Sequence, residues 1–364
     1  MMMGTPRKEL LIILSQLLYN SFRGVKLDCM YKVSILVPIY KVERFIDRCV
    51  KSLFGQTYPE LEFIFVNDCT PDNSVGILME ALKNYPQRSE QFRLIEHDHN
   101  RGLAASRNTA LDNATGEFVC VVDSDDWLEI NAIELLVNRQ IETGADIVTG
   151  NMMMHKNEGD IPFFEKVYSS KEDFVLQQLE KTWDHTIYRK LIRRSLFELN
   201  NIRCIEGYNM TEDRYQMAQL AYFADSYSQI NDIIYHYERR NENSIMAQKD
   251  KERILRRDYE YLQNWLGIRD FFSDKEVVYS NKANVESMRF AKQYLISIVK
   301  LNSKQWYYRI ADILDQEVPE NQELAGWTTK GIKGRYLHSF FWVELNYQRE
   351  RMERFVKRRF FRVN

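Results

Sequence analysis

Phe118–Trp127 reads FVCVVDSDDW, an apolar run that ends in three acids within four residues. A run this short and this apolar is typical of a strand buried on both faces, as in a parallel sheet. Asp123, Asp125 and Asp126 are then delivered to the carboxyl edge of the sheet, where open α/β sheets bind ligands. Crowded carboxylates repel one another unless donors or a hard cation neutralise them, and a divalent ion that carries substrate phosphates is the usual solution.

Asp126 also has a structural interpretation. With Glu129, three residues further on, it resembles a capping box for the helix that follows. We favour this cap for Asp126. No such local role accounts for Asp123 and Asp125, although an Asp-x-Asp pair alone is a weak signal.

The composition indicates a globular protein. The chain has 364 residues, of which 45% are hydrophobic and 13% aromatic, enough for one large domain or two ordinary ones. A formal net charge of -2 argues against general affinity for nucleic acid. The charge is uneven, because Arg349–Asn364 carries seven basic and two acidic residues and so suits an anionic surface.

The five cysteines show no C-x-x-C spacing, and two of them lie inside apolar runs. Buried free thiols in a reducing compartment are therefore favoured over disulfides, which places the protein in the cytoplasm. Arg7 and Lys8 precede an apolar stretch that superficially resembles a signal sequence but is too short and interrupted to span a bilayer. We expect residues 1–30 to form an amphipathic extension that lies on a membrane or on the protein, or to precede a true start at Met30.

From Val33 onward the hydrophobic pattern alternates between strand and helix. Stripes with i, i+3, i+4 and i+7 spacing between the strands indicate amphipathic helices. This alternation implies right-handed parallel crossovers, so we expect an α/β fold with a mainly parallel, Rossmann-like sheet flanked by helices. The predicted strands are Val33–Val37, Leu61–Val66, Phe92–Ile95, Phe118–Val122 and Asp146–Thr149.

The pattern changes further along the chain. Periodicity weakens after Gly159, and a new helix is expected after Thr211, whose hydroxyl suits an N-cap. Ile230–Tyr237 has a β-rich composition, and the later sequence is strongly helical. We therefore expect one domain over residues 31–246 and a helical C-terminal region with a basic tail over residues 247–364.

An ordered set of short motifs gives the chain a family resemblance. In chain order the set comprises Pro38-Ile39-Tyr40, Asn67-Asp68, Asn100-Arg101-Gly102, Arg107-Asn108, Gly116-Glu117, Asp123-Ser124-Asp125-Asp126, Thr211-Glu212-Asp213 and Tyr235-His236-Tyr237-Glu238-Arg239 with Ser244. Over about Val33 to Met246, the chain resembles the family 2 glycosyltransferases of the GT-A fold. The ordered set is far more specific than any one of its members.

The resemblance implies a nucleotide-diphosphate sugar donor, with a UDP-sugar favoured, and inversion at the anomeric carbon by direct displacement. It also implies Mn²⁺ or Mg²⁺, held by Asp125 with Asp123 adjacent, as a Lewis acid on the leaving diphosphate. Asp213 matches the family's base, which takes the proton of the attacking hydroxyl. His236 lies in a region that some relatives use to close over the diphosphate or metal, so it joins the candidate metal ligands.

Donor binding follows from the same resemblance. The loop ends after the first two strands match positions that surround the nucleotide base, and the helix N-terminus after Gly102 favours phosphate. The residues expected to bind the donor are Pro38, Tyr40, Glu43, Asp68, Arg107, Asp123, Ser124 and Arg239. The chain departs from the family at Cys69 and Ala110, where glycine is usual. Both side chains are small, so we expect these changes to affect only the shape of the donor that the nucleotide pocket accepts.

Several of these residues could instead have a purely structural role. Asp213 falls in the first turn of a helix, where acids complement the helix dipole, and this role is compatible with catalysis. Arg107 also fits a surface arginine paired with an acid. His236 also fits an interior histidine with satisfied hydrogen bonds, and Arg239 fits a solvated arginine.

We expect the protein to transfer a hexose or N-acetylhexosamine to a hydroxyl of a glycan or lipid-linked acceptor, in assembly of a cell-surface polysaccharide. Peripheral contact of the basic tail with anionic lipid suits such an acceptor, and a packed terminal helix with a solvated basic face is the alternative. A catalytically silent nucleotide-sugar-binding partner is the second hypothesis. A nucleotidyltransferase is the third, but residues 38–43 lack the glycine-rich basic loop that holds a triphosphate.

Overall fold

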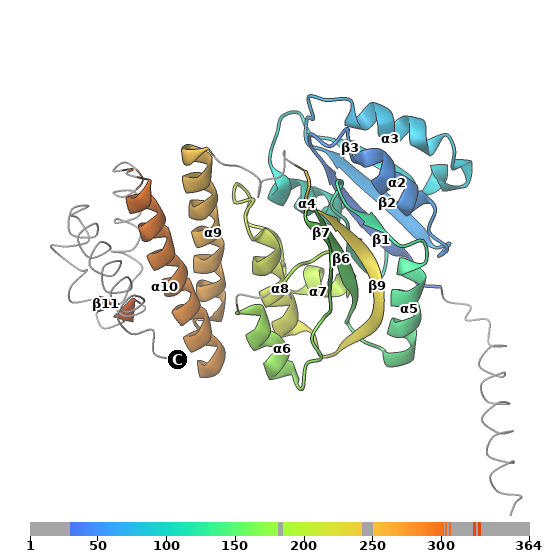
Figure 1. Cartoon of the computed structure of the whole chain (residues 1–364). Coiled ribbons are helices and arrows are strands. Elements are labelled where there is room, and N and C mark those ends of the chain that lie inside the picture. Colours follow the sequence, from blue (N-terminus) through green and yellow to red (C-terminus); the bar gives the residue numbers. More distant parts are fainter. Residues whose placement is uncertain are drawn as a thin grey trace, which may run out of the picture.

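A central β-sheet with helices on both faces forms the body of the protein (Figure 1). The computed structural model describes residues 30–180, 185–241, 250–301, 303, 306, 323–324 and 327–328. The basic tail over Arg349–Asn364, the expected domain boundary at residue 246, and all but the last residue of the N-terminal extension lie outside this part of the chain.

Four strands form the parallel part of the sheet. β1 pairs in parallel with β2 and β4, and β2 pairs in parallel with β3. Every residue of β1 is buried, as expected for a strand covered on both faces. The strands are β1 Val33–Ile39, β2 Leu61–Asn67, β3 Phe92–Glu96 and β4 Phe118–Val121.

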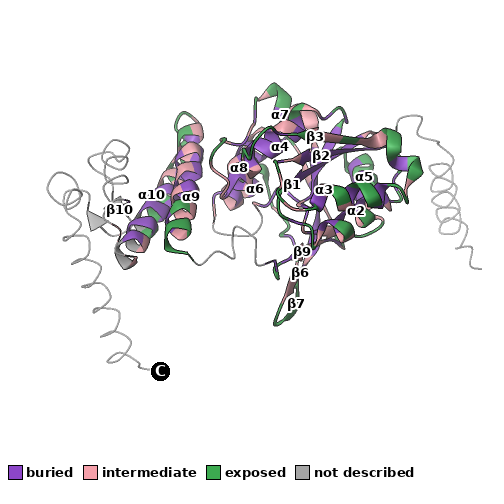
Figure 2. Ribbon diagram, turned by 90° about the horizontal axis from the view of Figure 1, so that it is seen from above, coloured by how far each residue is buried: buried purple, intermediate pink, exposed green. Residues whose placement is uncertain are grey.

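The rest of the sheet is mixed. Its strand order is β3-β2-β1-β4-β8-β6-β9-β5, with β7 paired to β6 as an exposed hairpin strand (Figure 2). β8 runs antiparallel to β4 and β6, whereas β9 runs parallel to β6. The predicted α/β class is therefore confirmed, with antiparallel pairs added beyond β4. These strands are β5 Trp127–Leu128, β6 Ile147–Lys156, β7 Gly159–Phe163, β8 Lys190–Arg193 and β9 Tyr227–Glu238, and a separate hairpin joins β10 Glu323–Leu324 to β11 Trp327–Thr328.

Two hydrophobic cores lie on opposite faces of the sheet. α2, α3 and α5 pack on the face that presents Ile35 and Val37. α4, α6, α7 and α8 pack on the face that presents Leu36 and Ile64. The helices are α2 Ile46–Phe54, α3 Ser74–Leu82, α4 Leu103–Asp112, α5 Ala132–Thr143, α6 Lys171–Gln178, α7 Arg194–Leu199 and α8 Glu212–Phe223, with a 3-10 turn over Pro86–Gln91.

Two long helices, α9 (Lys251–Phe272) and α10 (Val277–Lys300), lie side by side and extend the second core away from the sheet (Figures 1 and 2). Trp265 of α9 is fully buried, and its ring stacks on Phe290 of α10 with centroids 4.9 Å apart. The guanidinium carbon of Arg214, in α8, lies 5.2 Å from the Trp265 ring centroid. In the described ranges, no helix combines the length and the apolar character needed to cross a bilayer.

The predicted helix cap at Asp126 is wrong. The next helix, α5, begins at Ala132, after the short strand β5. The buried Asp126 carboxylate instead accepts hydrogen bonds from the Tyr235 hydroxyl at 2.6 Å and from the Glu238 N–H at 2.7 Å. Asp126 therefore joins the end of β4 to the end of β9, a long-range role that a local sequence motif cannot reveal.

The start of α8 is predicted correctly, but the predicted cap is not made. Thr211 precedes the helix with a left-handed φ of 64°, and its side chain caps no helical N–H. The hydroxyl donates instead to the carbonyl of Met210 at 2.5 Å. Glu212 and Asp213 therefore occupy the first turn without a side-chain cap before them.

Candidate active site

Asp123-Ser124-Asp125-Asp126, called the acid run below, forms a turn at the carboxyl end of β4, beside β1. The Val122 N–H donates to the Leu36 carbonyl at 3.0 Å, so parallel pairing continues up to the residue before Asp123. A turn follows in which the Asp126 N–H donates to the Asp123 carbonyl at 3.0 Å. Asp123 and Asp125 are partly buried, and both stand at the sheet edge where the sequence predicted them.

Arg107 joins this edge to the start of α8. It projects from α4 and is buried, with Nη2 2.7 Å from Asp123 Oδ1 and Nη1 2.5 Å from Glu212 Oε1. Burial lowers the pKa of Arg107, but the carboxylates of Asp123, Glu212 and Asp213 outweigh it and hold the pKa well above its ordinary value. The guanidinium therefore stays charged and brings acids from two distant parts of the chain together.

Asp213 lies next to Glu212, in the first turn of α8. Its side chain is partly buried, and Oδ1 accepts a hydrogen bond from the Arg214 N–H at 2.7 Å. Burial raises the pKa of Asp213, while the charges of Arg107 and Arg214 oppose that rise. Burial likewise raises the pKa of Glu212, against the opposing charge of Arg107. The charge of Asp123 also contributes to the raised pKa of Asp213.

Asp125 has a partner that the sequence did not indicate. The Asn241 side chain is buried, and its Nδ2 donates to Asp125 Oδ2 at 2.8 Å. Burial and the neighbouring charge of Asp123 raise the pKa of Asp125 to about 6. A cation at this edge would lower that pKa, because it stabilises the ionised carboxylate.

The end of β9 holds Asn241 near the acid run. Tyr235 bridges two positions, because its hydroxyl donates to Asp126 and accepts from the Asp123 N–H at 3.3 Å. The Glu238 carboxylate binds Arg48 of α2 at 3.0 Å and Arg240 at 2.5 Å. These contacts tie the segment after β9 to both α2 and β4.

Asp68, predicted to contact the donor, organises a loop in this structure. It is buried at the end of β2, and its carboxylate accepts hydrogen bonds from the N–H groups of Arg101 at 2.7 Å and Gly102 at 2.8 Å. His97 Nδ1 lies 2.8 Å from the same carboxylate. Gly102 has a φ of 92°, which favours glycine, and it directly precedes α4. Asp68 thereby fixes the start of the helix that carries Arg107.

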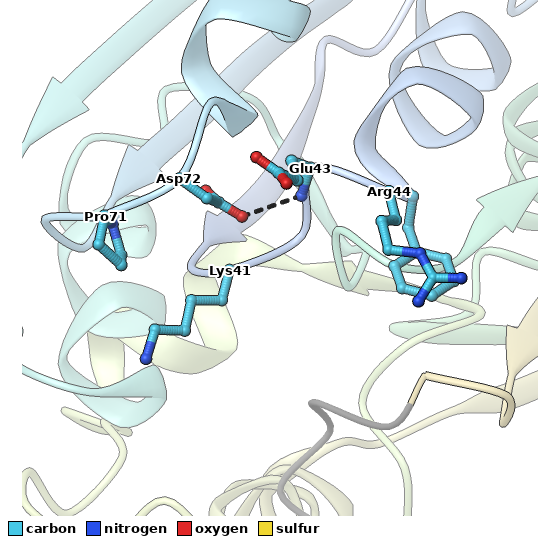
Figure 3. Close-up of a pocket in the computed structure, with 6 residues that line it drawn as sticks. Lys41, Glu43, Arg44, Pro71 and Asp72 are labelled. Atoms are coloured by element: carbon cyan, nitrogen blue, oxygen red, sulfur yellow. Dashed lines mark hydrogen bonds between the residues drawn. The ribbon is translucent and has the colours of Figure 1, made fainter.

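A cavity of about 230 Å³ lies between the loops that follow β1 and β2 (Figure 3). Its lining includes Glu43, whose N–H donates to Asp72 Oδ2 at 3.1 Å and whose carboxylate accepts from the Asn73 N–H at 3.0 Å. Burial raises the pKa of Asp72, but hydrogen bonds from Ser74 and Thr70 more than offset it, so the pKa is lowered. Glu43 therefore holds the two loops together in this structure.

The other predicted donor residues lie around the same edge. Pro38 is in β1, opposite Val66 of β2, and Tyr40 follows β1 with 40% of its surface exposed. Ser124 is buried within the acid run. Arg239 is exposed, and its guanidinium carbon lies 5.9 Å from the Tyr237 ring centroid.

His236, the third candidate metal ligand, has protein partners at both ring nitrogens. Nε2 lies 2.8 Å from Glu129 Oε1, and Nδ1 lies 3.0 Å from Nε2 of His155. Its ring also stacks on Trp127, with centroids 4.7 Å apart. These contacts occupy both ring nitrogens in this structure, and His236 stays a predicted ligand of Mn²⁺ or Mg²⁺. Among the described residues, no group of three or more His, Cys, Asp or Glu side chains is arranged to hold a metal ion.

The sequence matches known glycosyltransferases over these strands and helices. The family described as Glycosyl transferase family 2 matches residues 34–200. Glycosyltransferase GlyG of Streptococcus pneumoniae serotype 4 is 30% identical over 229 residues, which cover 59% of this chain and 72% of GlyG. The chain belongs to glycosyltransferase family 2.

Two further relatives extend well beyond their match to this chain. Glycosyltransferase GlyA of the same Streptococcus strain is 32% identical over 218 residues, 57% of this chain and 30% of GlyA. The poly(ribitol-phosphate) beta-glucosyltransferase of Bacillus spizizenii is 25% identical over 311 residues, 85% of this chain and 44% of that protein. The chain thus spans less than half the length of these two relatives.

The chain also shares the GT-A fold of a solved structure. The crystal structure of S. aureus TarS 1-349 in complex with UDP-GlcNAc superposes with a TM-score of 0.65 at 21% identity, covering 92% of this chain and 94% of that one. The likeness establishes a shared fold.

Sequence reasoning on this family 2 chain missed the roles of Tyr235 and Asn241. Both bind acids of the run through contacts that span more than 100 residues. Tyr235 begins the motif Tyr235-His236-Tyr237-Glu238-Arg239, so the order of the motifs indicated that it lies near the site. It did not indicate the hydrogen bonds that Tyr235 makes. Asn241 follows Arg240 without any local pattern that could have singled it out.

Proposed function

We propose that this family 2 chain is an inverting, Mn²⁺- or Mg²⁺-dependent transferase. In this proposal it moves a hexosyl or N-acetylhexosaminyl group from a nucleotide-diphosphate sugar to a hydroxyl of a cell-surface glycan or lipid-linked acceptor. The observation that carries the proposal is the Arg107 bridge between Asp123 and Glu212. Asp213 follows Glu212 in the chain. The bridge therefore supports one active site, with Asp213 as the base on one side and the acid run on the other.

Asp213 is the proposed general base. As the acceptor oxygen attacks the anomeric carbon, the O–H proton passes to the Asp213 carboxylate. The bond from that carbon to the diphosphate oxygen breaks, and the leaving nucleoside diphosphate keeps the electron pair. Burial raises the pKa of Asp213, which makes its carboxylate a stronger proton acceptor, while the helix N-terminus and the charges of Arg107 and Arg214 limit that rise.

Asp125 and Asp123 are the proposed ligands of the divalent cation. One oxygen of Asp123 contacts Arg107 and one oxygen of Asp125 contacts Asn241, which leaves each carboxylate a second oxygen to offer. Two carboxylates suit Mg²⁺ or Mn²⁺, because such ions are commonly held by one or two carboxylates together with substrate phosphates. When bound, the ion would neutralise negative charge on the leaving diphosphate.

The comparisons support a UDP-sugar donor and a surface-polymer acceptor. The TarS structure of the same fold holds UDP-GlcNAc, and the Bacillus spizizenii relative is a poly(ribitol-phosphate) beta-glucosyltransferase. In this proposal Pro38, Tyr40 and Asp68 surround the base, with Glu43, Arg107, Ser124 and Arg239 as the further donor contacts.

We also propose that the reaction takes place in the cytoplasm, with peripheral contact at the inner face of the plasma membrane. The thiols of Cys49, Cys69, Cys120 and Cys204 are free, which suits a reducing compartment. The basic tail over Arg349–Asn364 would supply the attraction to anionic lipid. Sedimentation with anionic vesicles, with and without residues 349–364, tests this part of the proposal, and equal pelleting of both forms contradicts it.

Substitution of Asp213 by Asn tests the proposed base. We expect kcat to fall about a hundred- to ten-thousand-fold, the usual contribution of general base catalysis. Donor affinity, measured by thermal shift with a panel of nucleotide sugars in Mn²⁺ or Mg²⁺, should remain nearly unchanged. Asp225→Asn is the matched control, because Asp225 lies just after α8 with its side chain 93% exposed.

Two outcomes separate the alternatives. Normal turnover by Asp213→Asn would exclude Asp213 as the base. Tight donor binding by the unmodified protein without transfer or slow donor hydrolysis would instead favour the silent nucleotide-sugar binder.

A further inference from the structure

The segment that leads into α8 is held by α9, which lies beside α8 (Figures 1 and 2). The Asn209 N–H donates to Glu260 Oε2 at 3.0 Å, and Nδ2 of Asn264 donates to the Met210 carbonyl at 2.9 Å. Glu260 and Asn264 are buried and lie one helical turn apart on α9. Together they fix two consecutive residues just before the turn of α8 that carries Asp213.

The next residue, Thr211, has a backbone conformation that needs such support. Its φ of 64° lies in the left-handed region, which a β-branched residue rarely adopts. Conformations of this kind persist only where neighbouring contacts enforce them, and they are concentrated at functional sites. The Thr211 carbonyl accepts a hydrogen bond from the Tyr215 N–H at 3.2 Å, at the start of α8. The backbone at Thr211 therefore sets the direction in which α8 and Asp213 follow.

Asn209 extends the same constraint to α4. Its Oδ1 accepts a hydrogen bond from the Ala104 N–H at 3.0 Å, in the first turn of the helix that carries Arg107. A Cβ atom at Gly102 would lie 2.5 Å from this oxygen, so a side chain there would displace Asn209. The two helices that meet at the Arg107 bridge are thus anchored to one segment, and Glu260 anchors that segment to α9.

Asn264 is an unfavourable residue for its position unless its amide has a role. It is fully buried in the interior of α9, where asparagine is a weaker helix former than leucine. Among the described residues its Oδ1 has no hydrogen-bond partner, and a buried unpaired acceptor is destabilising. The Met210 carbonyl does not depend on this amide, because it also accepts from the Thr211 hydroxyl. The Asn264 amide therefore contributes to the position of Met210 more than to the stability of the fold.

We propose that Asn264 and Glu260 are positioning residues for the transfer reaction. Through the segment Asn209–Thr211 they hold Asp213 at the distance and angle from the acid run that proton transfer requires. The inference rests on the proposed role of Asp213 as the base. Displacement of a catalytic group by about 1 Å can cost about a hundredfold in rate, so support from outside the site affects kcat. The helical region then has a role in catalysis in addition to packing on α8.

Asn264→Leu separates positioning from stability. Leucine has a similar size, forms helices better and removes the unpaired oxygen, so Tm should equal that of the unmodified protein or exceed it. The kcat for UDP release from UDP-glucose or UDP-GlcNAc with Mn²⁺ should nevertheless fall about ten- to a hundredfold, while the donor KM changes by less than about twofold. A purely structural role for Asn264 would give the opposite result, a lower Tm with unchanged kcat.

Glu260 gives an independent test through a conservative variant. Glu260→Gln keeps an oxygen that can accept from the Asn209 N–H, so its kcat should stay within about twofold of the unmodified value. Glu260→Ala removes the acceptor and should lower kcat about tenfold or more. Asn281→Leu is the matched control for Asn264→Leu, because Asn281 is exposed on the neighbouring helix α10, and it should leave kcat unchanged.

The outcomes separate this inference from the proposed function. Unchanged kcat in folded Asn264→Leu and Glu260→Ala, alongside an inactive Asp213→Asn, would overturn the positioning role and leave the base in place. No UDP release by the unmodified protein, or normal release by Asp213→Asn, would remove the proposed function and this inference with it. Circular dichroism shows whether each variant is folded.

Discussion

Arg107 shows how one side chain can organise a site. Its two terminal nitrogens reach Asp123, 16 residues away, and Glu212, 105 residues away. All three groups have been taken largely out of water, so removal of the guanidinium would leave two carboxylates without their buried partner. The sequence pointed to Asp123, Asp213 and Arg107 separately through motif order. It did not reveal that Arg107 binds both acidic segments, because no local pattern records a contact over 105 residues.

Replacement of Arg107 by Lys tests this bridge. A single ammonium cannot reproduce the two-armed geometry of a guanidinium. We expect the free energy of unfolding to fall by about 1–3 kcal/mol, because the ammonium leaves one of the two carboxylates without its hydrogen-bond donor. If the proposed function is right, kcat/KM also falls at least a hundredfold.

Arg101→Lys is the matched control for Arg107→Lys. Arg101 precedes the same helix, but its contact with Glu206 is between side chains that are 37% and 49% exposed. Such a pair contributes little, so stability should change by less than about 1 kcal/mol. Urea denaturation of both variants makes the comparison. Similar losses in the two variants would show that the Arg107 bridge has no special role.

At the scale of elements, local patterns predicted the leading strands and helices well. β1, β2 and β4 are short apolar runs, and their burial on both faces is what the sequence showed. The antiparallel pairings in the other half of the sheet could not be predicted from local patterns. β8 has only four residues, and its neighbours β4 and β6 come from distant segments of the chain. The true partners of Asp126 were missed for the same reason: they belong to β9, more than 100 residues away.

Glu62 of β2 holds three segments together and gives a prediction about pH. Its buried carboxylate accepts hydrogen bonds from Ser34 of β1, from Thr115 and from the Gly116 N–H at 3.1 Å, and it pairs with Lys32 at 3.0 Å. Burial alone would raise its pKa, but these donors lower it from 4.5 to about 2. The folded form therefore gains stability above the unfolded pKa and loses it as the pH falls toward 2.

Glu62→Gln should destabilise the protein by about 3 kcal/mol near neutral pH, an upper estimate from the size of the pKa shift. The difference from the unmodified protein should shrink progressively below pH 4.5. Denaturant unfolding at a series of pH values measures this difference. Glu60→Gln, at an exposed neighbouring residue, should show almost none of it. A constant Glu62→Gln effect from pH 7 to pH 3 would mean that the carboxylate's charge does not stabilise the fold.

At the scale of the whole molecule, the second core runs without a break from the sheet into the C-terminal helices. The same cluster contains Val121 of β4, Met217 of α8, Trp265 of α9 and Phe290 of α10. Arg214, the neighbour of the proposed base, rests its guanidinium on the Trp265 ring. The helical region therefore packs on α8 and helps to hold it in place.

Trp265→Ala tests whether the sheet and the helices stabilise each other. Loss of a fully buried tryptophan typically costs about 3–5 kcal/mol, which for a chain of this size corresponds to a fall in Tm of roughly 5 °C. If the two regions share one core, far-ultraviolet circular dichroism and tyrosine fluorescence should report one transition at the same lowered temperature. Val277→Ala is the control, because Val277 begins α10 with 73% of its surface exposed and should shift Tm little. Two separated transitions, with only the helical one moved by Trp265→Ala, would show instead that α9 and α10 are stable independently of the site they border.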